Sequence, residues 1–170
     1  MEQVALNNVQ LDYLARDDPQ LKPYFYGTVA CDRLSKTPDK KTPRGYIVNT
    51  DPHDQPDQHW LALWTYQKVC EMMDSYALPL ERYEQATSLR DWVVRHRKYV
   101  VTDGKSLQAL NSKSCGDYAL LYLKAKARGR TLQECLNDFS DRDYVSNDHK
   151  ASQRVKQLIV GSELVSHKVC

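Results

Sequence analysis

The sequence predicts an α+β fold in which a central mixed or antiparallel sheet is flanked by helices. Two neighbouring segments, 59–66 and 67–74, both suit strands, and no crossover fits between them, so they are expected to form an antiparallel hairpin. Further strand-like segments lie at 24–29, 44–50 and 98–102, with helical patterns around them. At 170 residues the chain is expected to form one domain over 1–170.

The first element is expected to be a short helix capped by Asn7 or Asn8 and stopped by Asp18-Pro19. Its apolar positions on one side are Val9, Leu11, Leu14 and Ala15. A basic loop with two prolines is expected between Asp32 and Gly45. The sequence therefore predicts one helix before the first strands.

The 59–74 hairpin is the first segment that indicates chemistry. If its turn is centred between Tyr66 and Gln67, the register places His59 opposite Asp74. Directly opposed residues have Cβ atoms roughly 4.5 to 5.5 Å apart, close enough for a carboxylate to orient an imidazole. A loop of odd length would shift this register, and taken alone the pairing could be a surface coincidence.

Three more helices are expected in the second half of the chain. Residues 81–97 carry Trp92, Val93 and Val94 as apolar surface. Thr131 and Glu134 are spaced to cap a short helix, and 143–160 has the pattern of a last one. These helices would supply the layers that cover the sheet.

A further helix begins where a cysteine stands. Ser114 is a good N-cap, and Asp117 can return a hydrogen bond to it, which predicts a capping box with Cys115 in the first turn. Backbone N–H groups and the helix dipole favour a thiolate there. Gly116 would let a substrate backbone approach closely, and Gly129 suits a left-handed helix end. The alternative is that Cys115 is a small buried apolar residue.

Four residues together supply the roles of acyl transfer. A histidine can hold a cysteine as a thiolate, an aspartate can orient that histidine, and a glutamine amide can donate to an oxyanion. The candidates, in chain order, are His59, Asp74, Gln108 and Cys115. The sequence therefore predicts a nucleophilic cysteine hydrolase.

Composition excludes several other classes. The chain is 41% hydrophobic and 27% charged, with no apolar run long enough for a membrane span and no basic-then-apolar start typical of a secretory signal, so it is expected to stay inside a cell. Five widely spaced cysteines argue against a disulfide framework and a zinc site. Basic clusters at 36–44, 95–98 and 124–130 are better explained as solvated faces than as a nucleic-acid surface.

The same residues carry a resemblance. Pro23 to Thr28 resembles Pro-Tyr-Phe-x-Gly-Thr, and Ile47 to Thr50 matches Ile-Val-Asn-Thr, of the adenain family of adenovirus-type cysteine proteases. His59-Trp60 matches its His-Trp, Asp74 its acidic residue, and Gln108 to Gly116 its Gln-x-x-Asn-Ser-x-x-Cys-Gly. The resemblance runs from about Tyr24 to Arg128. The SUMO-specific cysteine proteases are more distantly similar.

The resemblance implies an endopeptidase that matures viral structural precursors at Leu-x-Gly-Gly or Leu-x-Gly-x-Gly sites. His59 would be general base, Asp74 its orienting partner, and Cys115 the nucleophile, while Gln108 with the Cys115 N–H would form the oxyanion hole. Trp60 would line the site, unless it is a core tryptophan. A monomer in the host nucleus and the virion is implied.

Two departures concern activation. The family's activating viral peptide is disulfide-linked to a cysteine about eleven residues before the catalytic glutamine, where this chain has Arg97. The chain is also shorter and less basic than adenain, which weakens the expectation of a viral DNA cofactor. We therefore expect no cofactor to be required for the chemistry itself, with a viral peptide or DNA as candidate activators.

Two other functions fit the sequence. An isopeptidase acting on ubiquitin-like or SUMO-like modifiers would use the same chemistry, because their Gly-Gly tails suit the same narrow cleft. A catalytically silent module binding nucleic acid or capsid would show a steep salt dependence and would not respond to changes at Cys115.

Overall fold

The computed structural model describes residues 5–34, 42–54, 59–96, 99–102 and 104–166, and the side chains up to 161. Parts of the basic loop expected between Asp32 and Gly45 and of the cluster 95–98 lie outside these ranges. Arg97 and Cys170 lie outside them too. No structural statement is therefore attached to those positions.

The α+β fold predicted from the sequence is confirmed. Five strands form one mixed sheet in the order β1-β2-β3-β4-β5. The β1/β2 and β4/β5 pairs are parallel, and the two central pairs are antiparallel. The strands are β1 (Phe25–Ala30), β2 (Arg44–Asn49), β3 (Trp60–Tyr66), β4 (Val69–Met73) and β5 (Tyr99–Thr102).

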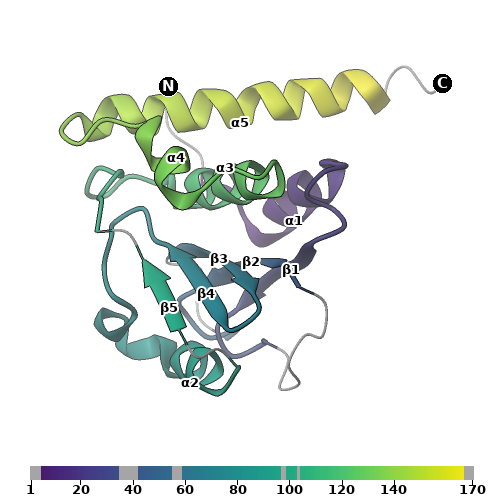
Figure 1. Ribbon diagram of the computed structural model, residues 1–170. Coiled ribbons are helices and arrows are strands. Elements are labelled where there is room, and N and C mark those ends of the chain that lie inside the picture. Colours follow the sequence, from purple (N-terminus) through teal and green to yellow (C-terminus); the bar gives the residue numbers. More distant parts are fainter. Residues whose placement is uncertain (1–4, 35–41, 55–58, 97–98, 103, 167–170) are drawn as a thin grey trace.

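Helices cover both faces of this sheet (Figure 1). On one face lie α1 (Asn8–Asp17), α3 (Cys115–Ala127), α4 (Leu132–Asn137) and α5 (Tyr144–Ser166), and on the other lies α2 (Thr87–His96). β3 is buried along all but its last residue, because side chains of both faces enter a core. The two cores, one on each face, therefore fix the strand ends that carry the site.

The β3/β4 hairpin exists as predicted, but its register was wrong. Tyr66 pairs with Val69, so Gln67 and Lys68 form a two-residue turn, one position later than predicted. Gln67 has φ of 48°, in the left-handed region that such turns require. If this register is extended beyond the end of β4, the residue opposite His59 is Tyr76 and not Asp74.

Capping predictions were confirmed at two helices. Asn7 caps α1 and forms a capping box with Gln10, and Thr131 does the same with Glu134 at α4. Leu11, Leu14 and Ala15 are buried as expected, but Val9 is 68% exposed, so its predicted place on the apolar side was wrong.

The single helix expected over 81–97 was wrong in its first part. Two 3₁₀ turns, Leu80–Arg82 and Glu84–Ala86, precede α2. Val94 is 81% exposed, whereas Trp92 and Val93 are buried. The last helix begins as predicted but continues past 160 to Ser166. The hydrophobic period alone did not separate these short turns from the α-helix that follows them.

Candidate active site

Two residues at neighbouring strand ends form the centre of the candidate site. His59 immediately precedes β3 and Asp74 immediately follows β4. His59 Nε2 lies 2.8 Å from Asp74 Oδ1, with side-chain exposures of 7% and 2%. The predicted contact therefore exists, although the hairpin register that suggested it is shifted. The Asp74 side chain reaches His59 from beyond the end of the strand.

Asp74 is held in place by several donors besides His59. Its Oδ1 also accepts from the Tyr76 N–H at 2.9 Å. Its Oδ2 accepts from the Tyr83 hydroxyl at 2.6 Å and from the Leu78 N–H at 3.3 Å. Because both oxygens are hydrogen-bonded, the buried carboxylate has a fixed orientation towards the imidazole.

Two tyrosine rings enclose His59. The Tyr76 ring lies 5.0 Å away and the Tyr83 ring 5.5 Å away, both stacked on the imidazole. Burial alone would lower the pKa of His59, but hydrogen bonds to Asp74 and to Cys115 raise it to about 9. The raised pKa favours the protonated imidazole at neutral pH, and Nε2 is the ring nitrogen that contacts Asp74.

Cys115 stands at the first position of α3 and is half-buried, as the sequence predicted. The predicted capping box between Ser114 and Asp117 is absent. The Ser114 side chain makes no capping hydrogen bond, and Asp117 is buried at 5% exposure. Burial and the nearby Asp148 raise the pKa of Asp117 to about 7, although Lys156 opposes this. The first-turn N–H groups still supply a positive helix end beside Cys115.

The far end of α3 was predicted correctly. Gly129 has φ of 81°, its N–H donates to Lys126 O at 2.9 Å, and the Arg130 N–H donates to Ala125 O at 3.1 Å. This is a Schellman motif. The stop signal in the sequence therefore located the end of the helix that begins at Cys115.

Gln108 lies in the same region but is engaged with its own loop. It is 2% exposed, and its Oε1 accepts from Ser75 Oγ at 2.6 Å. Its Nε2 donates to the carbonyl and the hydroxyl oxygens of Ser112, at 3.0 and 2.9 Å. The amide therefore braces the segment that leads to Cys115.

Trp60 and Gly116 both face the core. Trp60 is 5% exposed, in agreement with the alternative that it is a core tryptophan. A Cβ at Gly116 would lie 3.3 Å from the Leu11 side chain and 3.5 Å from Trp60. The close approach at Gly116 is thus used by α1 packing against α3. The predicted approach of a substrate backbone at Gly116 stays a prediction.

Sequence reasoning missed four residues that hold this site. Tyr83 and Ser75 bind Asp74 and Gln108 respectively. Asp148, from α5, accepts from the Tyr118 hydroxyl at 2.7 Å and from the Ala109 N–H at 3.2 Å. Asn147 donates to the Leu107 carbonyl at 3.1 Å. These four residues act on the site because they lie near it in the folded protein. No local signal in the sequence indicates that proximity.

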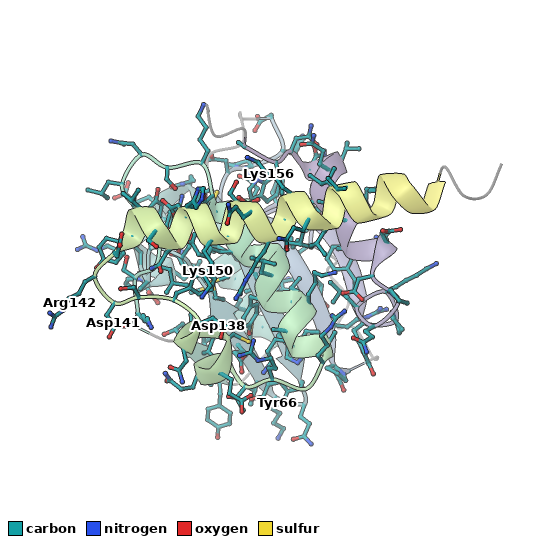
Figure 2. All side chains as sticks on the ribbon, turned by 90° about the horizontal axis from the view of Figure 1, so that it is seen from above. Tyr66, Asp138, Asp141, Arg142, Lys150 and Lys156 are labelled. Carbon is teal, nitrogen blue, oxygen red and sulfur yellow. The ribbon has the colours of Figure 1, made fainter. Side chains whose placement is uncertain are left out.

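The basic cluster at 124–130 is largely used in ion pairs. Lys124 and Arg128 bind Asp18 at 2.7 and 2.8 Å, and Lys126 binds Glu71 at 3.1 Å. Arg130 binds Asp138 at 3.1 Å, and Figure 2 shows Asp138 beside α5. The basic residues of this cluster therefore have a structural role, in ion pairs within the protein.

Two kinds of feature are absent from the part of the chain that the structure describes. Among these residues, no group of three or more His, Cys, Asp or Glu side chains is arranged to hold a metal ion. In the same residues, none of the helices has the length and hydropathy required to cross a membrane.

Comparison with known proteins gives a structural likeness. No family model matches the sequence, and no curated protein matches it. The fold is similar to that of the ASFV pS273R protease, with a TM-score of 0.50 and 13% identity over 87% of this chain. A structure of the Se-Met form of that protease matches 64% of this chain with a TM-score of 0.41 and 15% identity.

The chain spans 66% of the length of the first of these structures and 42% of the second. At such identity the likeness is one of fold. The chemistry has to be argued from the residues of this chain.

Proposed function

We propose that this protein is a cysteine endopeptidase with Cys115 as nucleophile, His59 as general base and acid, and Asp74 as the residue that orients His59. One observation carries the proposal. A buried imidazole is hydrogen-bonded to a fixed carboxylate through one nitrogen and interacts with the cysteine at a helix start. A cation between a carboxylate and a thiol is the arrangement that holds a thiolate ready at neutral pH.

The reaction follows from this arrangement. Cys115 Sγ attacks the scissile carbonyl carbon and forms a C–S bond, and the carbonyl oxygen becomes an oxyanion. The C–N bond then breaks as the leaving amine takes a proton from His59. Water, giving its proton back to His59, hydrolyses the resulting thioester. Asp74 keeps Nε2 occupied, so that the other ring nitrogen serves both proton transfers.

The oxyanion is assigned to two donors. The first is the Cys115 N–H in the first turn of α3, where helix N–H groups lack intrahelical partners. The second is the Gln108 amide, after one of its two contacts with Ser112 is exchanged for the substrate. Ser75 would hold the amide oxygen while the nitrogen turns.

The substrate class follows the resemblance found in the sequence. The proposed substrates are structural precursor proteins of a virus or virus-like element, cut at Leu-x-Gly-Gly or Leu-x-Gly-x-Gly sites in the nucleus or virion. Viral DNA or a viral peptide would act as an activator and would not enter the chemistry. An isopeptidase would instead cut a ubiquitin-like modifier faster than a short peptide with the same tail.

The test is the rate of iodoacetamide alkylation of each cysteine between pH 5 and 8, measured by mass spectrometry. We expect Cys115 to react fast near pH 6 and to lose this advantage in His59→Ala. Cys31 and Cys135 are internal controls, because burial raises the pKa of each to about 11. His53→Ala, which removes an exposed histidine, is the matched control. If Cys115 still reacts like an ordinary thiol with a pKa of ~8.5 after DNA and candidate viral peptides are added, the proposal fails.

A further inference from the structure

An open groove of about 670 Å³ begins beside the candidate active site. Its lining is largely apolar and includes Leu78, Leu110, Tyr144 and Val145. Leu110 is 85% exposed and Val145 is 73% exposed. Large apolar side chains that face water together in a groove next to a reactive centre are typical of a binding surface.

The groove is continuous with the catalytic residues. Tyr76 and Gln108 line the groove, and Tyr76 is the ring that stacks on His59 at 5.0 Å. This ring therefore belongs both to the groove lining and to the surroundings of His59. A peptide bound at Cys115 could therefore continue into the groove over Tyr76.

The wall that carries Leu110 is anchored. Ser112 N–H donates to Ala109 O at 3.2 Å and closes a tight turn, and Asn111 takes the left-handed φ of 63° within it. The Ala109 N–H is held by Asp148 of α5 at 3.2 Å. Leu110 is thus presented on a braced turn, next to Tyr144 and Val145 at the start of the same helix.

The direction of the substrate follows from the proton transfers. The leaving nitrogen must reach His59 to be protonated, and the oxyanion must reach the Cys115 N–H and Gln108. The residues after the scissile bond therefore depart past His59 and its stacking partner Tyr76. Tyr76 also lines the groove, which links the groove to this part of the substrate.

We propose that this groove binds apolar side chains of the two or three substrate residues that follow the scissile bond. The proposal rests on the protease function proposed above and adds a specificity that the resemblance does not supply. Two charged residues, Arg142 and Asp143, also line the groove, and Arg142 points outward from the segment before α5 (Figure 2). Its apolar walls, by contrast, favour leucine, isoleucine, valine, methionine or phenylalanine.

The test uses the full-length protein and a library of peptides made from a digested proteome. Cleavage products are sequenced by mass spectrometry, and residue frequencies are compared on both sides of each cut. We expect apolar residues to be enriched several-fold in the first three positions after the cut. In the double variant Leu110→Ser/Val145→Ser this enrichment should fall by at least half, while the preference before the cut stays as in the wild type.

The matched control is Val94→Ser, because Val94 is 81% exposed on α2, on the opposite face of the sheet. It should leave both preferences unchanged. Each single variant checks one wall, since Leu110 and Val145 belong to different elements.

Three outcomes would overturn the inference. Apolar enrichment only before the cut would assign the groove to the acyl side, and unchanged enrichment in the double variant would exclude these walls. In both cases the protease function stands. An uncut library would instead refute the protease function, and the groove assignment with it.

Discussion

The molecule contains two histidine–aspartate pairs of similar length in different surroundings. His59 and Asp74 lie 2.8 Å apart with side-chain exposures of 7% and 2%. His53 and Asp32 lie 2.6 Å apart with exposures of 48% and 25%. The shorter pair is thus the exposed one. Pair distance alone would therefore select the wrong histidine as the catalytic candidate.

The difference lies in what surrounds each imidazole. His59 is stacked between two tyrosine rings and interacts with Cys115, and its pKa rises to about 9 against the opposing effect of burial. At the exposed pair burial alone would raise the pKa of Asp32, but the hydrogen bonds from His53 together outweigh it and lower that pKa. Water screens an exposed pair, whereas a buried pair is screened much less and can hold a charge for chemistry. Burial of the pair and the nearby Cys115 thus distinguish the candidate site from the exposed pair.

The sharpest test of this comparison removes the carboxylate from each pair in turn. In Asp74→Asn we expect kcat/KM to fall by roughly 10²- to 10⁴-fold, because the imidazolium loses its partner and its orientation. The pKa of His59 should fall from about 9 towards its ordinary value. The alkaline limb of the pH–rate profile, where the general acid loses its proton, should therefore move to lower pH.

The matched control is Asp32→Asn, which should leave both rate and profile unchanged. The kinetics would be read with peptides recovered from the cleavage library, and the His59 titration followed by NMR. Equal losses in the two variants would refute the assignment of His59 and Asp74. Thermal unfolding of each variant separates a catalytic loss from a loss of fold.

A smaller effect is expected where a buried carboxylate has no histidine. Burial and Asp148 raise the pKa of Asp117 to about 7, so the folded state keeps a proton that the unfolded state releases above about pH 4. Stability should therefore fall as pH rises from about 4 to 7. Asp117→Asn should abolish this fall and raise the free energy of unfolding at pH 8 by about 2–4 kcal/mol.

Urea unfolding at pH 4 and pH 8 measures this difference. Asp18→Asn is a control of opposite sign: burial would raise the pKa of Asp18, but Arg128 and Lys124 lower it well below its ordinary value. Its carboxylate stabilises the fold above the unfolded pKa, and this contribution is lost as pH falls through the folded pKa. Asp18→Asn should therefore destabilise the protein at neutral pH. A wild-type protein equally stable at pH 4 and pH 8 would contradict the Asp117 prediction.

The smallest effect is expected at Tyr83. Tyr83→Phe keeps the ring on His59 but removes the hydroxyl that donates to Asp74 Oδ2 at 2.6 Å. The loss of one hydrogen bond to a buried charge should cost about 1–3 kcal/mol in stability and less than about tenfold in kcat/KM. Tyr66→Phe, at an exposed tyrosine of the hairpin turn (Figure 2), should change neither quantity. A rate loss as large as that of Asp74→Asn would give Tyr83 a direct part in the chemistry.

Local signals in the sequence were sufficient for much of the fold. The cap at Asn7, one of two candidates, the capping pair of Thr131 and Glu134, the start of α3 at Cys115 and its end at Gly129 were all predicted. Helix caps and left-handed glycines act over three or four residues, so the sequence states them directly. The side-chain contact between His59 and Asp74 was also predicted, because both residues flank one hairpin and a hairpin is a local structure.

The tertiary structure alone decided the rest. The hairpin register depended on the left-handed conformation of Gln67, which no Asn-Gly signal announces. Gly116 faces Leu11 because α1 packs on α3, and Tyr83 reaches Asp74 because two 3₁₀ turns replace the first part of a helix. Asp148 holds the Gln108 loop from α5, 39 residues away from Ala109. These contacts arise from packing between distant segments, and residue types at a given spacing do not encode them.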